Sequence, residues 1–474
     1  MPIVFTFFNP DVVKKNLSEV VQRTLDRSIR LAVTGLSGSG KTVFITSLVN
    51  QILHGMEGQQ LPFFEISSTG RFQGAKIIDQ KHLHVPAFRY ANGMRCLTLD
   101  PPIWPEATNG ISEIRLAIRF KDQSLLGKRL NRTSTLYLDI IDYPGEWLLD
   151  LPLIELSFEQ WCHEITDACQ FEPRKTLAQD WLAYMHTVDA SEETDDEQLR
   201  AAADRYTDFL YETKKAEYGL SMLQPGRFTM PGDMKGAPVL EFCPIPNLPE
   251  DCAHLPATSL FKVMEQRFEY YKSHVIKKFY TEHFSNFDRQ IVLVDILKAL
   301  NIGESSFTDM RSSVESVLKS YNYGKSGLFN RLFNVKIDKL LFAVTKADHV
   351  TPSQLHHLEA FLKKMISESH NNITFEGVET DTMALSAVKC TQAATSKFQG
   401  QAISCLKGTP KGSDKEVALF PGEVPEDIPT AEDWVGDRFN FIEFRPPFIK
   451  DVRSKGLPHI RMDRALQFLL GDKF

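Results

Sequence analysis

The sequence predicts an α/β fold in which a mostly parallel sheet is flanked by helices and carries a large helical insertion. Short apolar runs rich in β-favouring residues alternate with segments of helical period, which favours a parallel sheet covered on both faces. The first apolar run ends in a glycine-rich turn that leads directly into a helix. A long block at residues 151–285 has a helical period, broken in the middle by a proline-rich stretch at 225–256, and predicts the insertion.

Composition limits the class of molecule. The chain has 474 residues, of which 42% are hydrophobic and 24% charged, so it can bury a large core and needs more than one structural unit. Its net charge of −7 argues against nucleic acid as a partner. The seven cysteines are scattered without Cys-x-x-Cys spacing, which favours reduced thiols and a cytoplasmic location. We expect no signal peptide, and no membrane-spanning helix because no apolar stretch approaches about 18 residues.

The expected elements before the insertion surround the glycine-rich turn. They are a helix at 10–28, a buried strand at 29–35, a helix at 43–53, and strands at 111–120 and 134–147 that pair as a hairpin. Residues 55–110 hold many Pro, Gly and aromatic residues without a steady period. That pattern indicates a long insertion or a mobile loop.

Strand and helix signals alternate again after the insertion. The expected strands lie at 289–296, 338–345 and 382–388, and the expected helices at 306–320, 354–368 and 461–471. Residues 395–455 are rich in Pro and turn residues. The segment 324–336 is basic and apolar, which is typical either of a segment docked on the core or of one that contacts anionic lipid.

The strongest motif is Gly35-Leu-Ser-Gly-Ser-Gly-Lys-Thr42, a full match to the phosphate-binding loop of P-loop NTPases. Its glycines let backbone N–H groups curl around the phosphates, and the following helix adds its positive N-terminal end. We expect Lys41 to reach the β- and γ-phosphates and the Thr42 hydroxyl to bind Mg²⁺. The nucleotide-binding residues expected in this turn are Gly35, Ser37, Gly38, Ser39, Gly40, Lys41, Thr42 and Val43.

A second motif, Asp142-Tyr-Pro-Gly145, follows an apolar strand. A nucleotide hydrolase of this class needs a carboxylate there to hold a Mg²⁺-bound water, and a glycine whose N–H meets the γ-phosphate. The alternative is an ordinary β-turn, because Asp, Pro and Gly are all turn residues. Its place downstream of the phosphate-binding loop favours the functional interpretation.

A third motif, Thr345-Lys-Ala-Asp348, also ends a strand. In guanine-nucleotide proteins such a turn places a carboxylate against guanine N1–H and N2–H₂, while the Lys346 stem packs along the base; adenine lacks both donors. The alternative is a solvated polar loop. The residues Ser386, Ala387 and Val388, which end the next strand, fit the small loop that contacts guanine O6.

The motifs GLSGSGKT, DYPGEW, TKAD and SAV occur in this order at strand ends, and the chain thereby resembles P-loop GTPases of the Ras-like, translation-factor-related class. The stretches WPEATNGISE and DYPGEW are similar to the bacterial YcjX family of GTPases linked with envelope stress. This resemblance covers most of the chain. It implies a Ras-like G domain in two parts, at 1–150 and 286–474, separated by a helical insertion domain at 151–285.

The resemblance also implies roles for individual residues. Thr42 and Asp142 would hold Mg²⁺ directly and through water, and Thr108 would be the switch I threonine, which also contacts the metal; the alternative is a plain loop threonine. Glu146 stands where the family often has a Gln that orients the attacking water. A negative charge near the γ-phosphate is unfavourable, so we expect slow hydrolysis, or a Glu146 directed toward solvent or an arginine. No arginine finger is assigned, and the candidates by position are Arg89, Arg95 and Arg115.

The expected function is slow hydrolysis of GTP to GDP and phosphate with Mg²⁺. Lys41 and the backbone of 36–41 would neutralise the transition state, with Thr108, Gly145 and Glu146 as the further catalytic residues. The resemblance implies a switch that acts on a protein partner in a stress response. The candidate cellular location is peripheral, at the inner membrane. Two alternatives stay open: an ATP-dependent ATPase or kinase, and a non-catalytic module that holds nucleotide. The partner and the oligomeric state are not predicted.

Overall fold

The structure is a computed structural model that describes residues 27–36, 38–57, 60–108, 110–123, 133–215, 217–320, 337–375, 378–398, 401–436, 438–449 and 456–474. Residues 1–26, which hold most of the helix expected at 10–28, lie outside the described residues, as do Ser37 and the basic, apolar segment 324–336. None of the described helices is both long and apolar enough to span a bilayer.

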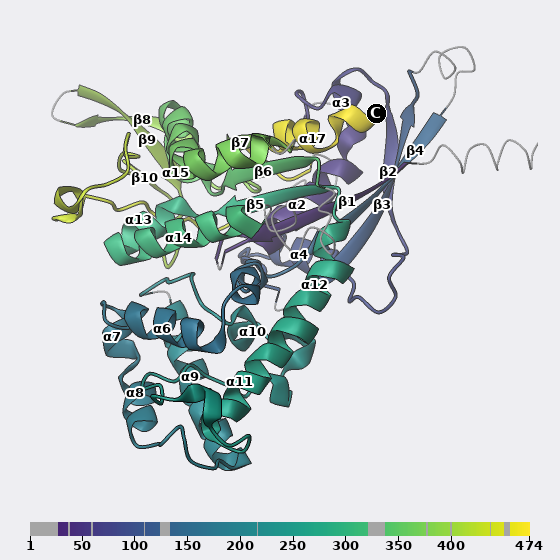
Figure 1. Ribbon diagram of the computed structural model, residues 1–474. Coiled ribbons are helices and arrows are strands. Elements are labelled where there is room, and N and C mark those ends of the chain that lie inside the picture. Colours follow the sequence, from purple (N-terminus) through teal and green to yellow (C-terminus); the bar gives the residue numbers. More distant parts are fainter. Residues whose placement is uncertain are drawn as a thin grey trace, which may run out of the picture.

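The described residues form one large sheet of seven strands, seen at the centre of Figure 1. In sheet order the strands are β2 (Phe72–Ile78), β3 (Ser112–Lys121), β4 (Thr133–Asp142), β1 (Arg27–Gly35), β5 (Arg289–Val294), β6 (Lys339–Val344) and β7 (Glu379–Ala384). The pairs β2–β3 and β3–β4 are antiparallel, and β4, β1, β5, β6 and β7 run parallel. The mostly parallel α/β sheet and the β3–β4 hairpin confirm the prediction.

Side chains alternate between two buried faces along the parallel strands. In β1, Leu31 and Val33 pack into one core and Ala32 into the other, as the two-residue period of a strand requires. The first core is covered by α2 (Lys41–Leu53) and α17 (Met462–Leu470). The helices on the other face are α13 (Ile296–Ile302), α14 (Glu304–Ser320) and α15 (Leu355–Phe375). Burial on both faces explains why these strands read as continuous apolar runs.

The chain between β4 and β5 is helical and forms a body below the sheet in Figure 1. Its helices are α6 (Phe158–Ala168), α7 (Arg174–Leu177), α8 (Gln179–His186), α9 (Asp196–Lys214), α10 (Gly226–Thr229), α11 (Leu260–Tyr270) and α12 (Lys277–Glu282). Aromatic rings fill its centre: Trp161 stacks on Phe268 with 5.0 Å between ring centroids, and Tyr206 lies against Trp181 at 4.9 Å. A π-helical segment, Tyr271–Ile276, joins α11 to α12 in one long helix.

Two segments expected to lack regular structure contain strands. Residues 55–110 hold α3 (Glu65–Ser68), the edge strand β2 and α4 (Tyr90–Leu97), so of the two alternatives expected for this segment the loop is wrong. Residues 395–455 contribute to a small antiparallel sheet made of β8 (Gln392–Phe398), β9 (Gln401–Gly408) and β10 (Val417–Leu419). These are edge or surface strands with few buried side chains, and therefore they lack the apolar pattern by which a strand is recognised.

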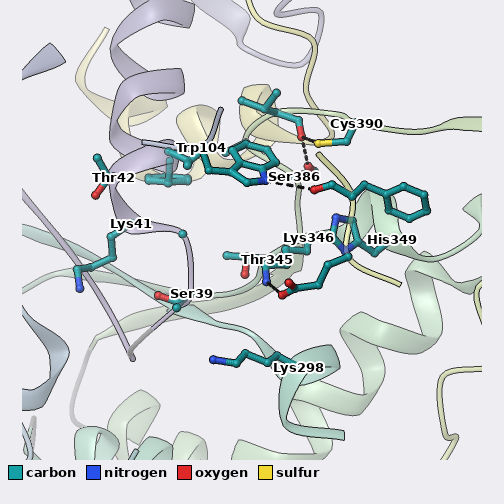
Figure 2. Close-up of a pocket in the computed structure, with 18 of the residues that line it drawn as sticks. Ser39, Lys41, Thr42, Trp104, Lys298, Thr345, Lys346, His349, Ser386 and Cys390 are labelled. Atoms are coloured by element: carbon teal, nitrogen blue, oxygen red, sulfur yellow. Dashed lines mark hydrogen bonds and ion pairs between the residues drawn. The ribbon is translucent and has the colours of Figure 1, made fainter. Parts of the chain in front are cut away.

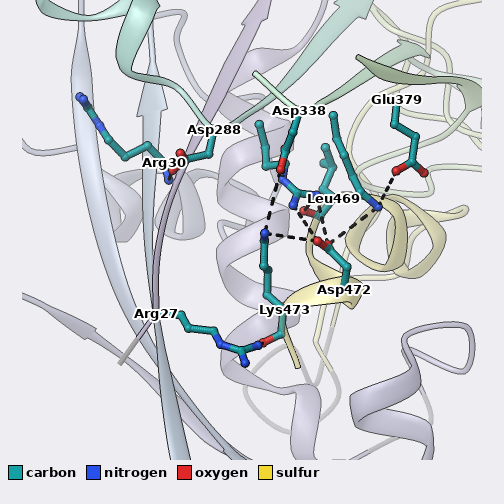
Figure 3. A network of polar contacts seen from close by, with 10 residues as sticks. Arg27, Arg30, Asp288, Asp338, Glu379, Leu469, Asp472 and Lys473 are labelled. Carbon is teal, nitrogen blue, oxygen red and sulfur yellow. Dashed lines mark hydrogen bonds and ion pairs between the residues drawn. The ribbon is translucent and has the colours of Figure 1, made fainter. Parts of the chain in front are cut away.

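A network of ion pairs closes the amino ends of the parallel strands, opposite the edge where the motifs lie (Figure 3). Arg289 at the start of β5 is fully buried and pairs with Asp338 at 2.5 Å and with Asp472 at 2.7 Å. Lys339 of β6 pairs with Glu379 of β7 at 3.2 Å. The carboxyl ends of the strands are thereby left as the open edge of the sheet.

Candidate active site

The glycine-rich turn connects β1 to α2 at the carboxyl edge of the sheet. Gly38 and Gly40 have φ values of 79° and 84°, which favour glycine. A Cβ on Gly35 would lie 2.4 Å from the Ser39 hydroxyl and 2.6 Å from the Leu293 carbonyl, so no larger residue fits there. The described residues of the turn therefore have glycine where the backbone requires it, and the N-terminus of α2 is directed at the space beside them.

Lys41 begins α2 and folds back over the turn. Its Nζ lies 3.3 Å from the Gly35 carbonyl, to which it donates. The hydroxyl of Ser39 is buried and has no hydrogen-bond partner among the described residues. The turn thus presents an ammonium group and a buried hydroxyl where the motif places phosphates.

Three oxygen-bearing side chains expected to hold a metal come together beside the turn. The hydroxyls of Thr42 and Thr108 are 3.2 Å apart. Asp142, at the end of β4, is buried, and within the described part of the chain neither of its carboxylate oxygens has a hydrogen-bond partner. Burial raises the pKa of Asp142, and the Lys41 ammonium and the Thr108 hydroxyl oppose that shift. Hydroxyl and carboxylate oxygens with unused lone pairs fit the hard donor set that Mg²⁺ prefers.

Asp348 is fixed by the next strand along the sheet. Its Oδ1 accepts a hydrogen bond from the Ser386 hydroxyl at 2.7 Å, and its Oδ2 accepts one from the Cys390 backbone N–H at 2.6 Å. The Ser47 hydroxyl of α2 donates to the Ala387 carbonyl at 2.5 Å and ties this loop to the phosphate-loop helix. A carboxylate has about four lone-pair sites, so about two on Asp348 remain for a ligand.

Lys346 has a left-handed backbone, with φ of 58°, and its side chain lines the cavity. Its Nζ lies 2.6 Å from Asp295 and 3.1 Å from Glu443. Burial alone would lower the pKa of Lys346, but these two carboxylates raise it well above the ordinary value. Burial would raise the pKa of Glu443, but Lys346 and Lys411 lower it to about 2. The Lys346 stem is therefore fixed before any ligand arrives.

The turn after β4 packs both on the phosphate loop and on the helical body. A Cβ on Gly145 would lie 2.6 Å from the Gly35 carbonyl, so the close approach requires glycine. Glu146 is buried and its carboxylate pairs with Lys214 of α9 at 2.9 Å. Burial would raise the pKa of Glu146, but Lys214 and Lys41 bring it below the ordinary value. Glu146 is thus directed toward a lysine of the insertion rather than toward solvent or an arginine.

Most of the predicted residues line one cavity of about 500 Å³ (Figure 2). Those in its lining are Gly38, Ser39, Gly40, Lys41, Thr42, Val43, Thr108, Thr345, Lys346, Asp348, Ser386, Ala387 and Val388. Gly35, Asp142, Gly145 and Glu146 are not part of the lining. Neither are the arginine candidates: Arg115 pairs with Asp139 at 3.5 Å, and Arg95 bonds Asn92.

Sequence reasoning missed several cavity residues. The indole N–H of Trp104 donates to the Phe444 backbone carbonyl at 3.2 Å, and both residues line the cavity. Glu443 and Cys390 belong to irregular segments that carry no motif. Lys298, on α13, extends toward the turn that holds Ser39 (Figure 2). These residues follow no recognisable spacing, because tertiary folding rather than sequence proximity brings them to the cavity.

The sheet, its motif-bearing carboxyl edge and the strand–turn–helix around the phosphate loop define the chain as a P-loop NTPase fold with a large helical insertion. More narrowly, residues 29–474 match the YcjX-like family, DUF463. The chain belongs to that family, which confirms the resemblance noted from its motifs.

Two relatives support the same assignment along the whole chain. The "Ras-like GTPase YcjX" of Escherichia coli (strain K12) is 42% identical over 465 residues, which cover 97% of this chain and 99% of the relative. The protein of the same name from Shewanella oneidensis is 39% identical over 479 residues, covering 97% of this chain and 98% of the relative.

Proposed function

We propose that this protein is a GTPase that binds GTP with Mg²⁺ in the cavity and hydrolyses it slowly to GDP and phosphate. One observation carries the proposal: Asp348, held by Ser386 and Cys390, lines the same cavity as the phosphate loop of 35–42. Both relatives bear the name Ras-like GTPase, which agrees with this function.

The base end of the cavity favours guanine over adenine. The free lone pairs of Asp348 suit the N1–H and N2–H₂ donors of guanine, and adenine offers neither at those positions. The fixed stem of Lys346 provides a flat apolar edge for the base, next to Thr345. The Ser386–Val388 loop lines the same cavity and would contact guanine O6.

Thr42, Thr108 and Asp142 would hold the Mg²⁺ ion. The carboxylate of Asp142 is the observation in favour: it is buried beside the Thr108 hydroxyl, and among the described residues neither oxygen has a hydrogen-bond partner with good geometry. When bound, the ion neutralises charge on the β- and γ-phosphates. The adjacent Thr42 and Thr108 hydroxyls, 3.2 Å apart, are close enough to share such a ligand.

Hydrolysis is proposed to depend mainly on charge and position. Lys41 would leave the Gly35 carbonyl to contact the phosphates, and the backbone N–H groups of 36–41 would surround them. The Gly145 N–H would meet the γ-phosphate. Because Glu146 is paired with Lys214, its carboxylate is not free to orient the attacking water, which favours a slow rate.

We further propose that the nucleotide state acts on a protein partner through the helical insertion. The turn after β4 is joined to the insertion by the Glu146–Lys214 pair and by Trp147, whose indole donates to Met230 at 2.9 Å. A rearrangement around the γ-phosphate would therefore reach the insertion. Protease cleavage of residues 151–285 should then differ between the GDP and GTP-analogue states, and identical patterns would contradict this coupling. We propose that this switch acts in a stress response and that the protein works at the inner membrane.

The deciding experiment is nucleotide binding by the purified protein, with GTP and GDP compared against ATP and ADP, with and without Mg²⁺. We expect a guanine preference of at least about tenfold, or about 1.4 kcal/mol. Asp348→Asn should weaken GTP binding about 100-fold and leave ATP binding unchanged, because only guanine uses the carboxylate. Equal or adenine-biased affinity would favour an ATPase. Retained GDP without turnover would favour a nucleotide-holding module.

A further inference from the structure

The cavity contains a cation that none of the motifs accounts for. Lys298 lies on α13, three residues after Asp295, whose side chain accepts from the Lys298 backbone N–H at 3.2 Å and caps the helix. The lysine side chain extends to the phosphate loop, where its Nζ would be 3.3 Å from a Cβ on Gly38. Figure 2 shows it approaching the turn that holds Ser39.

Lys298 differs from the other lysines of the cavity in its partners. Lys346 pairs with Asp295 and Glu443, and Lys411 pairs with Glu443. Lys41 donates to the Gly35 carbonyl. Within the described residues, the Lys298 ammonium has neither a hydrogen bond nor an ion pair. It is a half-buried cation beside an anion-binding loop, and its nearest carboxylate neighbour along the chain, Asp295, is bound to Lys346.

We propose that Lys298 is a catalytic residue that contacts the β-phosphate and stabilises its charge as the γ-phosphate departs. The inference rests on the proposed GTPase function. In that reaction the water oxygen bonds to the γ-phosphorus, and the bond from phosphorus to the bridging oxygen breaks. The bridging oxygen keeps the electron pair as part of GDP, and the protons of the water pass to inorganic phosphate and solvent.

The position of Lys298 suits a role in stabilising the leaving group, the β-phosphate of GDP. In the proposed complex the loop at Gly38 would surround the α- and β-phosphates, so a cation next to Gly38 would face the oxygen on which charge accumulates. The candidate arginines do not line the cavity. Lys298 therefore supplies from within the chain a positive charge of the kind that an arginine finger supplies elsewhere.

The test is single-turnover GTP hydrolysis by the full chain carrying Lys298→Met, together with the affinities for GDP and a non-hydrolysable GTP analogue. The rate should fall about 100-fold, while analogue affinity changes by less than about threefold. GDP affinity should fall more than analogue affinity, because the β-phosphate gains charge when the bond breaks. Lys298→Arg keeps the charge and should retain most of the rate. Lys319→Met, which removes an exposed lysine of α14, is the matched control and should match the wild type.

Three results would overturn the assignment of Lys298: an unchanged rate, a rate that falls only in step with analogue affinity, or a larger loss for the analogue than for GDP. Each requires a wild-type protein that binds and hydrolyses GTP. A wild type that does neither would overturn the proposed function itself, and with it this inference. Measurements on the wild type therefore distinguish failure of the Lys298 assignment from failure of the proposed GTPase function.

Discussion

The two ends of the cavity are prepared for a ligand in opposite ways. At the base end, both oxygens of Asp348 accept hydrogen bonds, and Lys346 pairs with two carboxylates. At the phosphate end, among the described residues, the hydroxyl of Ser39 lacks a partner, and so do both oxygens of Asp142, which lies outside the lining. The base end is thus a rigid, satisfied frame, whereas the phosphate end contains buried polar groups that a ligand would satisfy.

This difference indicates which part of the cavity supplies specificity and which supplies binding energy. A frame whose groups are already oriented selects a base with little reorganisation. A buried polar group without a partner costs stability, and a ligand that satisfies it recovers that cost. We therefore expect metal and phosphate to stabilise the protein more than the base does, and substitutions at the two ends to have different signatures.

The largest expected effect is at the phosphate end, with Asp142→Asn. The amide keeps the size of the side chain but loses the charge that would hold Mg²⁺, so we expect Mg²⁺ to improve GTP affinity about 100-fold less in the variant than in the wild type. Titration of Mg²⁺ at fixed GTP, followed by a fluorescent nucleotide, measures this. Removal of Mg²⁺ with a chelator should lower the GTP affinity of the wild type to that of the variant. A variant with unaltered Mg²⁺ dependence would contradict the assignment of Asp142.

A moderate effect is expected at the base end, with Glu443→Gln. Loss of this charge frees Lys346 on one side while Asp295 still holds it, so GTP affinity should fall about fivefold. Because the folded pKa of Glu443 is about 2 and its ordinary value is 4.5, its ion pairs stabilise the fold above about pH 4.5. That contribution is lost as the pH falls toward 2. The stability gap between wild type and variant, measured by thermal unfolding, should therefore close over this range and stay constant above it.

The outcome that would count against this view is a gap that widens on acidification. Lys411→Met serves as the comparison, because Lys411 is exposed and pairs with Glu443 from the side away from Lys346. It should change both affinity and stability less than Glu443→Gln does. An equal effect of the two substitutions would mean that Lys346 does not depend on Glu443 for its position.

Some parts of the fold and of the cavity can be predicted from the sequence and others cannot. The parallel strands bury both faces and end in motifs, so their apolar runs indicated the sheet and placed Asp142 and Asp348 at one edge. β2 escaped prediction because an edge strand with exposed side chains lacks that pattern. Cys390 could not be found from sequence, because it acts through a backbone N–H, which any residue possesses.

The smallest expected effect on turnover is at the turn between the cavity and the insertion, with Glu146→Gln. Since the carboxylate is bound to Lys214, its loss should change single-turnover hydrolysis by less than about threefold. The substitution leaves the half-buried Lys214 without its ionic partner beside a buried side chain, so the cost should appear in stability, at about 3 kcal/mol. Combining it with Lys214→Met should restore part of the melting temperature. A loss of about 100-fold in the rate with an unchanged melting temperature would instead show that Glu146 orients the attacking water, and the turn would then belong functionally to the phosphate end of the cavity.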